Sequence, residues 1–127
     1  MLELTINGKV YEFKFGMGFM REVNKYFQKP IDGIKDAKEN VGLQMMVAGI
    51  YAKDAEYLVR VLDAANKGFA PRVTVALLDT YVDECEDIDK LFEDVLDFLK
   101  TANATKNVTN QFIEQMEAAM EKQSQNQ

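Results

Sequence analysis

The first fifteen residues alternate between apolar and polar side chains on both sides of an Asn-Gly pair. Asn7 and Gly8 tolerate the positive φ angles of a type I′ turn, so this pair between two alternating runs predicts a β-hairpin over residues 2–15. A two-residue loop sets the register: Ile6 with Lys9, Leu4 with Tyr11, and Leu2 with Phe13. One face is then apolar, and it must pack on other elements because a lone hairpin is marginal in water. That face comprises Leu2, Leu4, Ile6, Tyr11, Phe13 and Phe15.

Beyond the hairpin, apolar residues recur every three or four positions, the spacing of amphipathic helices. The pattern predicts five helices, over about residues 18–28, 39–53, 54–67, 74–84 and 87–100. Asp54, Thr74 and Asp87 stand where they would cap the last three. Gly42 and Gly49 lie on one side of the second helix and would allow a close helix contact.

After Lys100 the composition changes to Thr, Asn and Gln. We predict a predominantly α member of the α+β class, in which residues 1–100 form a single globular domain. In it the hairpin packs on a compact group of four to five helices. Residues 101–127 are expected to form a polar C-terminal tail, weakly ordered or helical, with an amphipathic helix over about 108–122.

The charge is divided unevenly along the chain. The chain carries 15 basic and 21 acidic residues, a net charge of −6. Residues 1–75 hold 11 Lys or Arg and 9 Asp or Glu, a net of +2, whereas residues 76–127 hold 4 and 12, a net of −8. Binding to nucleic acid needs a basic face that neutralises phosphates. We therefore expect no nucleic-acid partner.

The expected compartment is the cytosol. Cys85 is the one cysteine, so an intramolecular disulfide cannot form. No secretory signal pattern precedes the first strand. The longest charge-free apolar stretch, residues 41–52, is shorter than the roughly 20 residues that span a bilayer. We expect no membrane partner.

The side chains that usually carry catalysis are few. The chain has no histidine, which removes Ser-His and Cys-His activation and most zinc sites. Four acidic neighbours surround Cys85 and make a reactive thiolate unfavourable there. The same acidic run lacks the spacing of a calcium loop, and Gly16-Met17-Gly18 lacks the rest of a phosphate-binding motif. We predict no enzyme, and no catalytic, cofactor-binding or metal-binding residue.

The function class that remains is binding to other proteins. Seven methionines are many for this length, and methionine suits adaptable apolar surfaces. Met20 and Met46 lie on core-like stripes, so core packing is the favoured interpretation for them, and a partner surface is favoured for Met116 and Met120. The candidate partner-binding residues are Leu43, Met46, Ile50, Phe112, Ile113, Met116 and Met120.

Two segments resemble a known family. Residues 4–16, Leu-Thr-Ile-Asn-Gly-Lys-Val-Tyr-Glu-Phe-Lys-Phe-Gly, and residues 19–24, Phe-Met-Arg-Glu-Val-Asn, resemble the tail assembly chaperones of siphophages of Gram-positive bacteria and of related prophages. The similarity is closest over residues 1–27. Beyond them it consists of length, a helical continuation, an acidic second half and a polar tail.

The resemblance implies a non-enzymatic chaperone in the host cell cytoplasm that binds the tape measure protein, helps to recruit tail tube subunits and is absent from the mature virion. In many such phages a frameshift adds a second domain that recruits the tube protein. The residues alone leave open a structural head–tail connector, a cytosolic protein-binding adaptor and a homo-oligomer.

Overall fold

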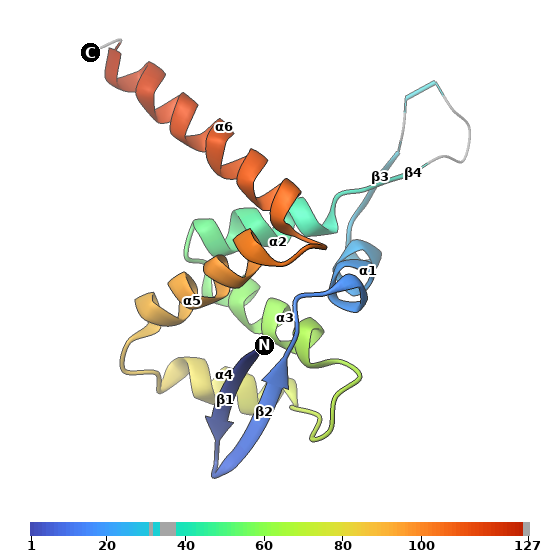
Figure 1. Cartoon of the computed structure of the whole chain (residues 1–127), viewed down its shortest axis with the longest axis vertical. Coiled ribbons are helices and arrows are strands. Elements are labelled where there is room, and N and C mark those ends of the chain that lie inside the picture. The colour runs from blue at the N-terminus through green and yellow to red at the C-terminus, as the bar shows by residue number, and fades with distance from the viewer. Residues whose placement is uncertain (31, 34–37, 126–127) are drawn as a thin grey trace.

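The computed structural model has two short hairpins and six helices, and it describes residues 1–30, 32–33 and 38–125 (Figure 1). The elements follow in the order β1 (Leu2–Ile6), β2 (Lys9–Phe13), α1 (Met17–Tyr26), β3 (Gln28–Pro30), β4 (Lys38–Asn40), α2 (Gly42–Tyr51), α3 (Ala55–Asn66), α4 (Val75–Asp83), α5 (Ile88–Thr101) and α6 (Lys106–Gln125). The predicted class, mostly helical α+β with an N-terminal hairpin, is confirmed.

The first hairpin has the predicted register. Leu2 pairs with Phe13, Leu4 with Tyr11, and Ile6 with Lys9. The turn residues Asn7 and Gly8 have φ angles of 51° and 79°, as a type I′ turn requires. Five of the six predicted apolar-face residues are buried, and Leu4 is half-buried against the same core.

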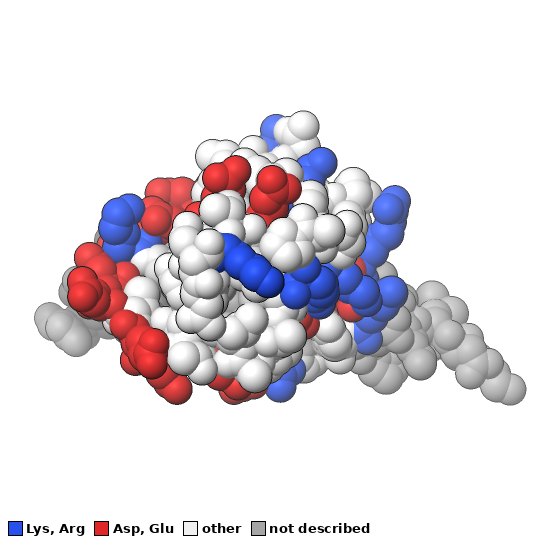
Figure 2. Space-filling view, turned by 90° about the horizontal axis from the view of Figure 1, so that it is seen from below, with Lys and Arg blue, Asp and Glu red and all other residues white. Residues whose placement is uncertain are grey.

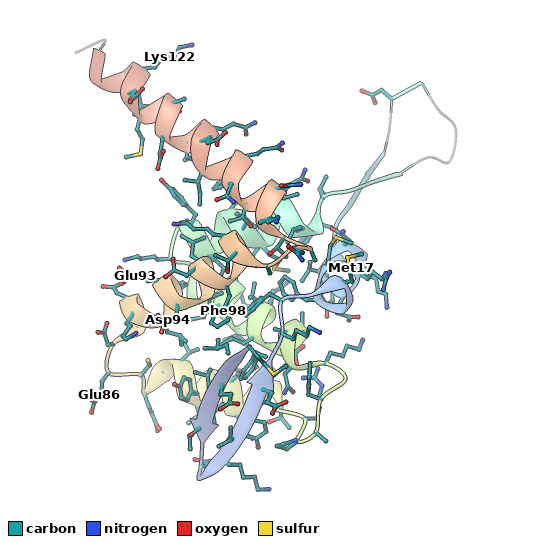
Figure 3. All side chains as sticks on the ribbon, in the orientation of Figure 1. Met17, Glu86, Glu93, Asp94, Phe98 and Lys122 are labelled. Atoms are coloured by element: carbon teal, nitrogen blue, oxygen red, sulfur yellow. The ribbon has the colours of Figure 1, made fainter. Side chains whose placement is uncertain are left out.

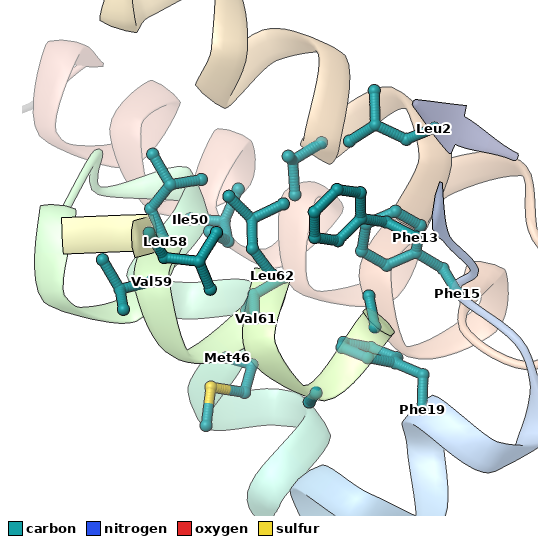
Figure 4. Close-up of a cluster of buried hydrophobic side chains, with 14 of the residues drawn as sticks. Leu2, Phe13, Phe15, Phe19, Met46, Ile50, Leu58, Val59, Val61 and Leu62 are labelled. Carbon is teal, nitrogen blue, oxygen red and sulfur yellow. The ribbon is translucent and has the colours of Figure 1, made fainter. Parts of the chain in front are cut away.

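The apolar face of the hairpin joins the helices in one core (Figure 4). Phe15 links the two parts, because its ring packs edge-on against Phe19 of α1 and stacks on Phe98 of α5. The core also takes residues from every helix up to α5, among them Val23, Met46, Leu62, Leu78 and Leu99. Burial of this shared surface is what fixes the hairpin on the helices.

The predicted helix caps are confirmed. Asp54 accepts a hydrogen bond from the N–H of Glu56 at 3.0 Å, and Thr74 accepts one from Leu77 at 3.1 Å. Asp87 accepts one from Lys90 at 3.1 Å. Each bond satisfies a donor of the first helical turn, so α3, α4 and α5 begin one residue after their caps.

Helix α2 lies at the centre and contacts α1, α3, α5 and α6. A Cβ atom at Gly42 would overlap the carbonyl group of Val23 in α1, and one at Gly49 would overlap the ring of Tyr57 in α3. The predicted close helix contacts are therefore present, with two different helices. The first turn of α2 has a distant cap, since the Asn24 side chain accepts a hydrogen bond from the Leu43 N–H at 3.0 Å.

Some helix bounds differ from the prediction. Helix α1 ends at Tyr26 and α2 begins at Gly42, because Gln28–Pro30 and Lys38–Asn40 pair as an antiparallel ladder that includes residues 28, 39 and 40, which were predicted to be helical. The final helix was predicted over about 108–122 and spans Lys106–Gln125. Residues 126 and 127 of the predicted tail lie outside the described residues.

Asn66, at the end of α3, is fully buried and ties three segments together. Its amide nitrogen donates to the carbonyl oxygens of Glu12 and Pro71, at 3.0 and 3.3 Å. Its amide oxygen accepts from the Val73 N–H at 2.7 Å and from Arg72 at 3.0 Å. This buried amide thus holds β2 and the loop before α4 against α3.

Candidate protein-binding surface

The surface starts at the corner between α5 and α6, which two buried threonines stabilise. The Thr105 hydroxyl donates to the Leu99 carbonyl oxygen at 2.7 Å, and the Thr109 hydroxyl donates to the Thr105 carbonyl oxygen at 2.8 Å. Asn110 also donates to the Lys100 carbonyl oxygen at 3.2 Å. These bonds satisfy the buried hydroxyls and set the direction in which α6 leaves α5.

The first half of α6 is docked. Val108 and Phe112 pack against the core, and the Phe112 ring meets the Tyr51 ring of α2 edge-on, with 5.5 Å between centroids. Such aromatic pairs add to the stabilisation from burial alone. The docked half is therefore part of the folded body, continuous with α2 and α5.

The second half of α6 projects away from that body (Figures 1 and 3). Ile113, near the end of the docked half, and Met116 are half-buried, whereas Met120, on the projecting half, is 60% exposed. These side chains lie at i, i+3 and i+7, on one stripe of the helix. We call Ile113, Met116 and Met120 the α6 stripe. It continues the line of Phe112 past the point where the core ends.

The structure places the predicted partner-binding residues in two different environments. Leu43, Met46 and Ile50 are 4%, 0% and 1% exposed, inside the core. A partner could contact them only if a helix packed on α2 moved away, so that contact stays a prediction. The four residues predicted on α6 lie together along one helix. The core interpretation favoured for Met46 agrees with its burial.

The charged side chains are unevenly distributed over the surface. Figure 2 shows acidic side chains on one side of the molecule and a band of basic ones toward the other. Glu86 points outward from the connection between α4 and α5, and Glu93 and Asp94 point outward from α5 (Figure 3). The projecting part of α6 adds Glu114, Glu117 and Glu121 beside the stripe. Acidic residues therefore follow one flank of the apolar stripe.

The described side chains include no group of three or more His, Cys, Asp or Glu arranged to hold a metal ion. Cys85 is a half-buried free thiol. Within the same described part of the chain, the helices are all too short or too polar to cross a membrane.

Sequence reasoning missed several polar contacts of the fold. Asn24 and Asn66 bond to partners on other elements, and Thr105 and Thr109 bond to carbonyl groups six and four residues back. A polar side chain in a mostly polar segment carries no periodic signal. The Thr-rich composition after Lys100 instead indicated weak order.

The comparisons with known proteins give one result. A family model described as phage tail assembly chaperone protein matches residues 3–114. No curated protein matches the chain, and no solved structure does. The match spans both hairpins, α1 to α5 and the docked half of α6, and the family is non-enzymatic and acts with tail proteins. The chain belongs to the phage tail assembly chaperone family.

Proposed function

We propose that the chain binds the tape measure protein of its phage before the tail tube polymerises, and that the α6 stripe is the main contact. Family membership supports tail proteins as the class of partner. The observation that carries the proposal is the projecting half of α6, where a line of apolar side chains continues without a core behind it.

The stripe suits a helical partner. Residues at i, i+3 and i+7 on one helix are the anchors of helix-in-groove recognition. Methionine side chains adapt to irregular apolar surfaces, so Met116 and Met120 could contact several successive stripes of one long helical protein. A partly exposed apolar line has no benefit for the free chain, and covering it on a partner removes the rest of it from water.

The acidic charge of residues 76–127 gives the complex its second property. A net charge of −8 over residues 76–127 would keep many chains soluble when they cover one tape measure protein, and would oppose contact between neighbouring copies. Many weak contacts along one protein hold through avidity yet release copy by copy. Tail tube subunits, recruited with the help of the chaperone, would displace it, leaving it absent from the virion.

We place this activity in the cytoplasm of the host cell. The resemblance of residues 4–24 supports a siphophage or prophage of a Gram-positive host. The family match favours a chaperone over the structural connector and the adaptor that the residues left open.

Co-expression with the tape measure protein of the same phage tests the proposal. Met116→Glu with Met120→Glu places two charges on the stripe, while Gln111→Glu with Ala118→Glu places the same charges on the opposite, exposed side of α6. We expect the native chain and the control pair to keep the tape measure protein soluble and the stripe pair to fail. Equal solubility with the two pairs, or with no chaperone, would reject the proposal.

A further inference from the structure

The two edges of the first hairpin are in different situations. In an antiparallel pair closed by a two-residue loop, Ile6 and Lys9 exchange hydrogen bonds, and so does every second pair beyond them. The backbone groups of the alternate residues then point outward. On β1 these are the N–H and C=O groups of Glu3 and Thr5, and on β2 those of Val10 and Glu12.

Helix α3 covers the edge of β2 and the residue that follows it. The Glu12 carbonyl oxygen accepts from Asn66 at 3.0 Å, and the Lys14 N–H donates to the Ala65 carbonyl oxygen at 2.9 Å. No bond of this kind is present between the outward groups of Glu3 or Thr5 and any other described residue. Both residues are exposed. β1 therefore offers an unpaired strand edge, a template for another extended chain.

A groove runs beside that edge. It has a volume of about 400 Å³ and lies between the end of β1, helix α4 and the connection from α4 to α5, which meet at one end of the molecule (Figure 1). Leu77 and Tyr81 give it an apolar wall. Burial raises the pKa of the Tyr81 hydroxyl, with the nearby Cys85 adding to the shift, so the hydroxyl stays protonated at neutral pH.

The charged side chains that line the groove are all acidic. Glu84 and Glu86 line it, and it has no Lys or Arg among its lining residues: Thr5, Ile6, Asn7, Leu77, Thr80, Tyr81, Glu84, Cys85 and Glu86. Glu3 adds a carboxylate on the strand itself. A ligand for this place must therefore offer backbone hydrogen bonds, apolar side chains toward Leu77 and Tyr81, and positive charge toward the rim.

We propose that the β1 edge binds an extended segment of a partner protein in which Lys or Arg alternates with apolar residues, added to the hairpin as a third strand. Main-chain bonds to Glu3 and Thr5 hold the segment, and the period of two along a strand turns its apolar side chains onto the groove. This site is separate from the α6 stripe and does not depend on the function proposed for it. It lets one chain hold a helical and an extended segment at once.

The probe for a test is a short synthetic peptide in which Lys alternates with Val. Titrated into the isotope-labelled full chain, it should shift the amide signals of Glu3 and Thr5 and slow their hydrogen exchange. The same peptide with N-methylated backbone amides should bind about tenfold more weakly or worse, because it loses the ladder bonds but keeps its charge. A counterpart in which Glu replaces Lys should not bind.

One pair of single variants and one double variant complete the test. Thr5→Pro removes an outward N–H at a position where an edge strand tolerates proline, and Val10→Pro makes the same change at the facing position of β2. We expect loss of peptide binding in the first and native binding in the second. Glu84→Lys with Glu86→Lys should weaken binding by about five- to tenfold, since two rim charges are reversed.

Three results would overturn the proposal. One is equal binding of the plain and N-methylated peptides, which would show that the peptide is held by charge attraction alone. This comparison is also the decisive measurement if Thr5→Pro does not fold. Another is unchanged exchange at Glu3 and Thr5. The third is protection of these amides without peptide in a concentration-dependent dimer, which would assign the edge to a second copy.

Discussion

Helices α2 and α6 both carry lines of apolar side chains, yet the fold uses them in opposite ways. Met46 of α2 is fully buried among four neighbouring helices, whereas Met120 of α6 is 60% exposed beyond the last of them. Glycine permits the first arrangement, since Gly42 and Gly49 let α1 and α3 approach α2 closely. The comparison teaches that an apolar stripe alone does not distinguish a core helix from a partner surface. The helices packed around a stripe decide whether it is buried or left for a partner.

The largest expected effect is at the closest approach of α2. Gly42→Ala would drive a Cβ atom into the backbone of Val23 and Asn24, which cannot yield as a side chain would. We expect the free energy of unfolding to fall by about 4 kcal/mol, measured by urea denaturation. Gly18→Ala in α1, where a Cβ atom meets nothing within 4 Å, is the control. It should leave stability unchanged or slightly raised; equal losses would contradict the close contact.

The two methionines give the most direct contrast. Met46→Ala leaves a cavity in the core and should lower the free energy of unfolding by about 3 kcal/mol. Met120→Ala should change it by less than about 0.5 kcal/mol, because the side chain is mostly in water. Binding to the tape measure protein, measured on the folded variants, should show the opposite order. Met120→Ala should weaken binding more than Met46→Ala does. Similar stability losses at both positions would mean that α6 is packed along its full length.

A smaller effect is expected where the docked half of α6 meets α2. Phe112→Ala removes the edge-on contact with Tyr51 and should cost about 1–2 kcal/mol, since Phe112 is half-buried. Hydrogen exchange should speed up in α6 and stay slow in α2. Gln111→Ala, one residue away on an exposed position, is the matched control. Faster exchange in α2 as well would show that the two helices form one cooperative unit.

The smallest effect concerns pH. The pKa of Glu22 lies below its usual value, chiefly because Lys67 donates a hydrogen bond to its carboxylate at 2.8 Å, with help from Lys25 and against the effect of burial. A pKa lowered by folding stabilises the protein above the unfolded-state pKa, and this stability is lost as the pH falls through the folded-state pKa. The Glu22–Lys67 ion pair joins α1 to the end of α3, and both of these helices pack on α2.

Glu22→Gln should therefore flatten the decline of stability in the acidic range and change little else, as measured by thermal unfolding across that range. Glu56→Gln removes an exposed carboxylate paired with Arg60 on a single helix and should leave the acidic decline as it is. If both substitutions flatten it equally, the decline does not report the link between α1 and α3.

Local patterns predicted most of the fold. The hairpin register followed from Asn7 and Gly8, because a two-residue loop leaves one pairing, and Asp54, Thr74 and Asp87 marked helix starts through bonds within one turn. The β3–β4 ladder and the anchoring of Asn66 were missed. Asn66 bonds to Glu12, 54 positions away, and such a contact leaves no spacing in the sequence.

For the candidate surface, periodicity found the stripes on both helices but could not rank them. Leu43, Met46 and Ile50 repeat at the same spacing as Ile113, Met116 and Met120. What separates them is the number of helices packed around each, a property of the tertiary structure. The polar composition of the tail favoured a partner surface for Met116 and Met120, which are half-buried and 60% exposed in the structure, while it underestimated the length of α6.

The central claim is that the projecting half of α6, rather than α2 or an acidic patch, receives the tape measure protein. Hydrogen exchange of the chaperone, alone and in complex with the tape measure protein of its phage, tests it most directly. We expect exchange across Glu114–Gln123 to slow strongly in the complex, with α2 unchanged. Unchanged exchange over that segment in a stable complex, with new protection elsewhere, would contradict the account.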